Sequence, residues 1–159
     1  MDRIMLKVGN EALAFFDVGK REYLANIENI ALNPENSFYQ LLPAIVNLAF
    51  SIELSFKALI NETDAKKCRH DLRKLFEKVG SPVKDILMKA IISKMQNYDA
   101  AFNEDAFWEH LERNKEAFED WRYYYQRGRA VDITFLYNMA TVTTNFVRTL
   151  KTALAKANL

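Results

Sequence analysis

Residues 40–62 constrain the fold most, because the middle of this stretch is apolar on nearly all sides when it is drawn as a helix. Such a helix is buried on most of its circumference. Two charged residues, Glu53 and Lys57, nevertheless lie on the same helical face as Phe50 and Ile60. A lone buried carboxylate is unfavourable, so Glu53 needs a partner.

Residues 41–60 are also nearly long enough to span a bilayer, but Asn47, Glu53 and Lys57 interrupt them. We therefore expect the core helix of a bundle and no membrane partner. The single cysteine, Cys68, cannot form an internal disulfide, and the N-terminus lacks a cleavable signal. Both features favour a cytoplasmic location.

Helical periodicity recurs along the rest of the chain, and no stretch alternates cleanly enough to indicate a strand. The further predicted helices cover residues 3–30, 72–79, 82–98, 103–125 and 132–154. We expect caps at Asn36 or Ser37, at Asn103 and at Asp132, with Pro43 in or near the first turn of the central helix. Residues 61–69 are predicted to be a polar connection.

With 159 residues, the chain suits one domain, which we expect to cover residues 1–159. The predicted fold class is all-α: an antiparallel up-and-down bundle of four long helices, plus one short helix inserted after the second. The formal net charge of +1 excludes a strongly basic nucleic-acid coat but leaves room for a local basic patch.

Arg122 is the partner that we predict for Glu53. It lies on the inner side of the predicted helix over residues 103–125, next to Phe118, and a guanidinium fits a carboxylate bidentately. The resulting pair is either a structural ion pair that sets the register of the bundle or the floor of a polar pocket. The local pair of Glu53 with Lys57, four residues on, is the remaining alternative.

The chain has two histidines, and His70 is the candidate for acid–base chemistry. His70 opens the short helix, where either His70 or Asp71 caps the helix, or His70 acts as a general base. His110 is expected at the surface or edge of its helix. With two His and one Cys, and without a P-loop, GxGxxG or HExxH motif, we expect no metal and no cofactor.

Basic residues cluster in two places, and one of the two clusters contains tyrosines. The members are Lys66, Lys67, Arg69, Arg73, Lys74 and Lys78, and then Tyr123, Tyr124, Tyr125, Arg127 and Arg129. Aromatic rings stack on bases while cations meet phosphates. The candidates for RNA binding are Arg69, Arg73, Tyr124, Arg127 and Arg129. The alternative is a solvated helix face beside core tyrosines.

Three segments of the chain resemble the HEPN family, a helical superfamily of prokaryotic toxin–antitoxin and phage-defence systems. They are residues 50–60 (FSIELSFKALI), 69–76 (RHDLRKLF) and 118–126 (FEDWRYYYQ). The resemblance implies an up-and-down bundle and a homodimer. It also implies a function that involves RNA, a nucleotide or a partner protein, such as a cognate toxin, an antitoxin or a nucleotidyltransferase.

One departure from the family bears on catalysis. HEPN ribonucleases carry an Arg, then four to six residues, then a His, and no Arg precedes His70 or His110 by that interval. We therefore expect a HEPN-like binding protein without the ribonuclease motif. One rival is a nonstandard, metal-independent ribonuclease around His70, Arg122 and Arg127. The other is a structural subunit that docks through Phe38, Tyr39 or the small residues Ser51 and Ser55.

Overall fold

The computed structural model describes the backbone of residues 2–32, 34–122 and 132–157, and the side chains of residues 7–27, 40–120 and 132–157. Every element within these ranges is a helix, which confirms the all-α prediction. In order, the helices are α1 (Asp2–Leu32), α2 (Pro34–Leu59), α3 (Glu62–Cys68), α4 (Leu72–Lys78), α5 (Val83–Met95), α6 (Glu104–Arg113), α7 (Ala117–Arg122) and α9 (Ile133–Ala157).

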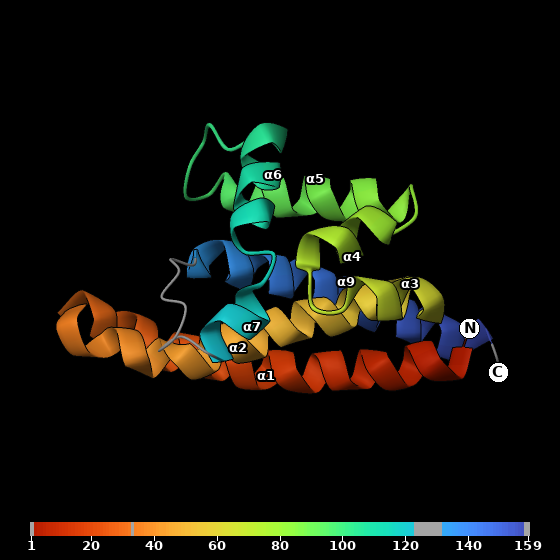
Figure 1. The fold of residues 1–159 in the computed structure, drawn as a ribbon, viewed down its shortest axis with the longest axis horizontal. Coiled ribbons are helices and arrows are strands. Elements are labelled where there is room, and N and C mark those ends of the chain that lie inside the picture. The colour runs from red at the N-terminus through yellow and green to blue at the C-terminus, as the bar shows by residue number, and fades with distance from the viewer. Residues whose placement is uncertain (1, 33, 123–131, 158–159) are drawn as a thin grey trace.

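The three longest helices, α1, α2 and α9, lie side by side and form the base of the molecule (Figure 1). α1 and α2 run antiparallel, whereas α2 and α9 run in the same direction. This is because α3–α7 carry the chain back over the base to the end where α2 begins (Figure 1). The predicted helix over residues 103–125 is divided into α6 and α7, so the described part contains three long helices.

Two glycines set how closely α1 approaches its neighbours. A Cβ atom on Gly19 would lie 2.9 Å from the backbone nitrogen of Leu48 in α2, and one on Gly9 would lie 3.0 Å from Val147 Cγ1 in α9. Glycine lowers the helix propensity of α1 slightly. Here the missing side chain lets the α1 backbone lie directly against the two other long helices.

The α2 helix is the core element that the sequence predicts. Residues 51–56 are buried without interruption, and the hydroxyls of Ser51 and Ser55 donate hydrogen bonds to carbonyls of α2 itself, at 2.7 Å each. The prediction that Ser51 and Ser55 form an exposed docking face is therefore wrong, because neighbouring helices cover them. The side chains of Phe38 and Tyr39 lie outside the described residues.

One segment of α2, Gln40–Leu59, is long and apolar enough to cross a membrane by length and composition, with a mean hydropathy of 1.4. In the fold, 67% of that apolar stretch is buried against other parts of the protein. A core helix of a soluble protein passes the same test, and this burial is what such a helix shows.

The start of α2 differs from the prediction. The helix begins at Pro34, so Asn36 and Ser37 lie within it and do not cap it, and Pro43 lies in its interior. An interior proline removes one backbone hydrogen bond and is normally disfavoured. Among the described residues, α1 and α2 share the most extensive contact between any two helices.

Two further local features depend on asparagine side chains. Residues 62–68, predicted as a connection, form α3, and Asn61 caps it by accepting a hydrogen bond from the backbone N–H of Asp64 at 2.9 Å. The break between α6 and α7 lies at the fully buried Asn114. Its side chain donates to the His110 carbonyl at 2.7 Å and accepts from the Asp132 N–H at 3.2 Å.

Candidate functional site

The carboxylate of Glu53 is 1% exposed and has two partners among the described side chains. Lys57 Nζ lies 2.6 Å from Oε1, which is the local pair that the sequence left open. His70 Nδ1 lies 3.0 Å from Oε1 and 2.9 Å from Oε2, a contact that the sequence did not predict. The buried carboxylate therefore joins α2 to the turn between α3 and α4.

The predicted pair of Glu53 with Arg122 stays a prediction. Arg122 is the last residue of α7, a helix that packs against α2, but its side chain lies outside the described residues. Lys57 and His70 already supply Glu53 with close partners of the kind that a buried carboxylate requires.

A tight turn over residues 68–71 places His70 beside Glu53. The N–H of Asp71 donates to the Cys68 carbonyl at 3.1 Å, and Arg69 has φ 52° and ψ −112°. These angles belong to the first central position of a type II′ turn, which is normally glycine. A residue with a Cβ atom is strained there by on the order of 1–3 kcal/mol.

Asp71, and not His70, caps α4, because its carboxylate accepts from the backbone N–H of Lys74 at 2.9 Å. This confirms one of the two capping alternatives. The His70 side chain is thereby left to contact Glu53.

His70 is anchored on one side and open on the other. Its side chain is 33% exposed, and Nε2 lies 3.9 Å from Oε1 of Glu119, at the range of an ion pair when the imidazole is protonated. Its ring lies 5.2 Å from the ring of Phe118, which stacks on Phe50 at 4.7 Å. In the neutral ring, the carboxylate at Nδ1 favours the proton on that nitrogen and leaves Nε2 as a proton acceptor.

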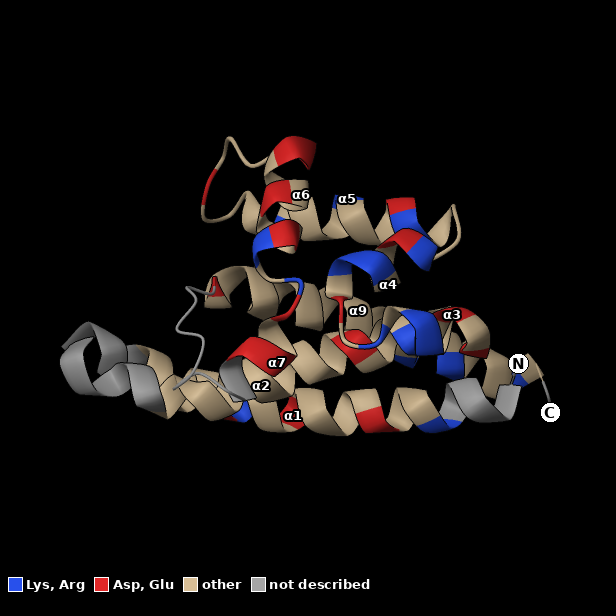
Figure 2. Cartoon of the chain, in the orientation of Figure 1, with Lys and Arg blue, Asp and Glu red and all other residues tan. Residues whose placement is uncertain are grey.

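Most of the predicted basic cluster on α3 and α4 forms ion pairs with acidic neighbours, and both signs of charge occur on this part of the molecule (Figure 2). The ion pairs are Lys66 with Glu62, Lys74 with Asp71, Lys78 with Asp64, and Arg73 with both Glu77 and Glu112. Lys67 and Arg69 are exposed and have no ion pair with any described residue. Of the RNA-binding candidates, Tyr124, Arg127 and Arg129 lie outside the described residues.

Arg73 serves to join α4 to α6. Its guanidinium lies 2.8 Å from Glu112 and 5.6 Å from the centre of the Trp108 ring. Hydrogen bonds from Lys115 and then from Arg73 lower the pKa of Glu112, and the bond with Glu112 raises the pKa of Lys115. Each partner thus stabilises the charged form of the others, and Arg73 is less available to a ligand than Arg69.

The second histidine occupies a different environment. His110 lies between the rings of Phe102 and Phe135, with centroid distances of 5.3 and 5.4 Å, and is partly buried. Its Nδ1 lies 2.9 Å from Asp132 Oδ2, but the two groups are not aligned as a hydrogen bond. Asp132 also caps α9 through the N–H of Phe135 at 3.0 Å, which confirms the predicted cap.

The described residues hold no group of three His, Cys, Asp or Glu side chains that is arranged to bind a metal ion, and Cys68 is buried and free. The expectation of no metal and no cofactor stays a prediction.

No family model, curated protein or solved structure matches the chain. The likeness to the HEPN family therefore depends on the three sequence segments alone.

Proposed function

We propose that the chain is a HEPN-like RNA-binding protein, and that its RNA contact is the turn over residues 68–71. One observation carries the proposal: Arg69 is exposed and forms no ion pair with any described residue. Its backbone is strained, and it directly precedes His70, which the buried carboxylate of Glu53 holds in place. Strain of this kind is concentrated at functional sites, where a side chain must be presented in one orientation.

The chemistry of the turn suits a phosphate group. The Arg69 guanidinium presents several donors, and a protonated His70 presents a further donor at Nε2. Glu119 has the opposite effect, because its carboxylate near Nε2 repels a phosphate.

Fluorescence anisotropy with an end-labelled single-stranded RNA tests the proposal. We expect Arg69→Ala to weaken binding by about threefold to tenfold and to reduce the dependence of affinity on salt, because one phosphate contact is lost. Glu119→Gln should strengthen binding, because the repulsive charge is removed.

Arg113→Ala is the matched control, since Arg113 is an exposed arginine on α6 that pairs only with Glu109 among the described residues. Equal losses in Arg69→Ala and Arg113→Ala would show unspecific attraction and contradict the proposed site. An absence of RNA binding at low salt would reject the function.

A second candidate function is a nonstandard, metal-independent ribonuclease. The observation that favours it is the imidazole held at Nδ1 by a buried carboxylate with Nε2 open, which is how a general acid–base histidine is oriented. His70 Nε2 would take the proton of a ribose 2′-hydroxyl as its oxygen bonds to phosphorus. The bond to the 5′-oxygen would break, and the same proton would pass to that leaving oxygen. The two arginines proposed with His70, Arg122 and Arg127, have side chains outside the described residues.

Cleavage is tested by incubating labelled RNA with the protein in the presence of EDTA and separating the products on a denaturing gel. Fragments ending in a 2′,3′-cyclic phosphate that disappear with His70→Gln would support the ribonuclease. Intact RNA with the wild-type protein would reject it and leave the binding proposal unaffected.

The biological setting is proposed from the resemblance. It comprises a cytoplasmic HEPN-like bundle, a homodimer, and a toxin–antitoxin or phage-defence system with a cognate partner or a nucleotidyltransferase. Light scattering tests the homodimer, and a monodisperse monomer would contradict it. The proposal of a purely structural subunit is weakened, since Ser51 and Ser55 are buried and cannot form its docking face.

A further inference from the structure

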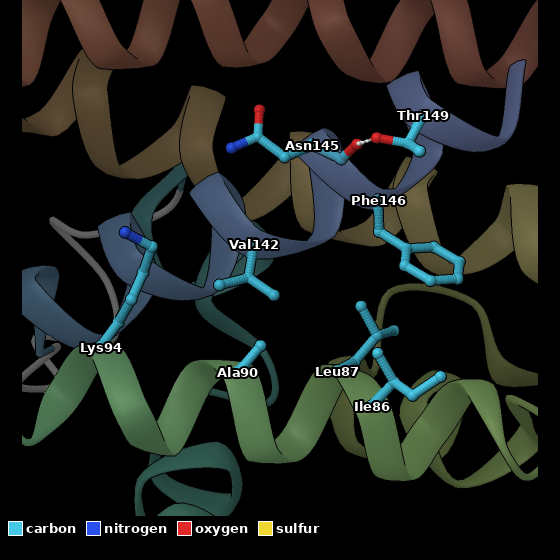
Figure 3. A pocket seen from close by; sticks show the side chains of 8 residues that line it. All are labelled: Ile86, Leu87, Ala90, Lys94, Val142, Asn145, Phe146 and Thr149. Atoms are coloured by element: carbon cyan, nitrogen blue, oxygen red, sulfur yellow. Dashed lines mark hydrogen bonds between the residues drawn. The ribbon is translucent and has the colours of Figure 1, made fainter. Parts of the chain in front are cut away.

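A shallow apolar groove of about 310 Å³ lies between α5 and α9, on a different part of the molecule from His70 (Figure 3). Its lining residues are Ile86, Leu87, Ala90 and Lys94 from α5, and Val142, Asn145, Phe146 and Thr149 from α9. A second, separate hollow of about 270 Å³ is lined by Val83 and Leu150 of the same two helices and by residues 58–60 and 80–81, and it shares no lining residue with the first. Ile86 is 52% exposed, so the groove presents apolar surface to solvent.

The two helices that form the groove are strongly basic. They carry six cations and one acidic residue, a net charge of +5, whereas the whole chain has a net charge of +1. The cations are Lys84, Lys89, Lys94, Arg148, Lys151 and Lys156, and the acidic residue is Asp85. Lys94 lines the groove, and Arg148 hydrogen-bonds to Asn145 on its wall. None of the six forms an ion pair with a described residue, in contrast to the cations of α4.

We propose that this groove binds an acidic amphipathic helix of a partner protein. The apolar floor matches the apolar stripe of such a helix, and Lys94 in the lining, with Arg148 held at Asn145, matches carboxylates beside that stripe. From Ile86 to Lys94 the groove extends along nine residues of α5, which corresponds to about 12 Å or two helical turns. A short helical segment therefore fits its length.

The charge and the lining discriminate against two other occupants. A second copy docking through the same face would bring Lys94 and the other cations of these two basic helices close to their own copies, which is repulsive. Single-stranded RNA binds by stacking bases on aromatic rings, and Phe146 is the one aromatic side chain among the groove's lining residues.

The test uses the full chain and a labelled, designed helical peptide of 16 residues. The peptide has Leu at alternating spacings of three and four, and Glu at the positions beside this stripe. A second peptide carries Lys in place of each Glu. We expect the acidic peptide to bind, with an affinity that falls as salt is raised, and the basic peptide not to bind.

Two pairs of variants locate the site. Ile86→Ser should weaken binding of the acidic peptide by about fivefold or more, while Leu24→Ser, which removes an equally exposed hydrophobic residue (49%) on α1, should leave it unchanged. Lys94→Glu should weaken binding, and Lys67→Glu, at an exposed unpaired lysine of α3, should not. Unchanged thermal melting of all four variants shows that the fold is intact.

No binding of the acidic peptide, or equal losses in each variant and its control, would overturn the proposal. If the acidic peptide does not bind and the Lys94→Glu variant loses RNA binding, the face is a nucleic-acid surface, and this result would also overturn the proposal. Self-association that Ile86→Ser abolishes would identify a second copy as the occupant and would likewise overturn it.

Discussion

The two histidines of this chain each lie beside a carboxylate, and the two pairs are built differently. The carboxylate beside His70 is Glu53, which is 1% exposed and also binds Lys57. The carboxylate beside His110 is Asp132, which is partly exposed and caps α9 through a backbone N–H. In the first pair the buried partner is the acid, and the imidazole reaches solvent. In the second the imidazole, which is 21% exposed, lies between two aromatic rings, and the acid has a local structural role.

The difference is the reason that the proposed function uses the first histidine–carboxylate contact and not the second. His70 has one nitrogen fixed and the other open, which is what binding or proton transfer requires. His110 has no aligned hydrogen bond at Nδ1, and its surroundings join α6 to the start of α9. Substitutions in the two pairs should therefore separate effects on ligands from effects on folding.

The largest effect is expected for Glu53→Ala. Removing the carboxylate leaves Lys57 and His70 without their common partner, and breaking a buried pair typically costs about 3–5 kcal/mol. We expect about 3 kcal/mol in the free energy of unfolding, because both partners are partly exposed. Urea denaturation measures it. Asp132→Ala is the comparison and should cost about 1 kcal/mol, the usual loss for a helix cap. Equal losses would remove the distinction between the two pairs.

Asn114→Ala should have the next largest effect. Its amide is fully buried and joins the His110 carbonyl to the Asp132 N–H, so the substitution leaves two backbone groups without that partner. We expect a loss of about 2 kcal/mol in the free energy of unfolding, measured by urea denaturation. RNA binding should stay unchanged, since this residue lies in the structural pair. A loss of RNA binding with unchanged stability would reverse the roles assigned to the two regions.

Arg69→Gly should stabilise the protein while weakening RNA binding. Glycine adopts φ 52° without strain, and we expect a gain of about 1 kcal/mol or less, because glycine also gives the unfolded chain more freedom. Arg69→Ala serves as the control, as it removes the guanidinium and keeps the Cβ atom. Thermal unfolding and RNA anisotropy together measure the two effects. A destabilised Arg69→Gly protein would show that the turn is not strained.

The smallest effect concerns the pH dependence of a partly exposed carboxylate, Glu112, which serves as a reference for the buried Glu53. The pKa of Glu112 is lowered from 4.5 by Lys115 and Arg73, so its ion pairs stabilise the fold above the ordinary pKa. That stabilisation is lost as the pH falls through the lowered pKa. The melting temperature of wild type should exceed that of Glu112→Gln at pH 7, and the difference should shrink towards pH 3. A difference that is constant with pH would exclude a charge effect.

Local signals in the sequence predicted the helices and several of their ends. The periodicity of apolar residues indicated an all-α chain, and the caps at Asp71, Asn103 and Asp132 follow from short polar side chains directly before apolar helical stripes. The pair of Glu53 with Lys57 is equally local, because residues four apart share a helical face.

The prediction was less complete where distant segments meet. The sequence indicated that Glu53 needs a partner. It did not indicate His70, because α3 and the strained turn after it place His70 there, and no local pattern predicted either of them. The break at Asn114 likewise depends on a hydrogen bond to Asp132, eighteen residues away. For Tyr124, Arg127 and Arg129 the sequence prediction stands alone.

The sequence by itself determined that this chain is helical, that α2 lies in the core, and that a carboxylate is buried there. The tertiary structure decided which group meets that carboxylate, why Gly9 and Gly19 lie at helix contacts, and which cations stay unpaired. The physical reason is distance along the chain. Helix formation and capping depend on neighbours within about four residues, whereas the partner of a buried charge depends on the path that the whole chain takes.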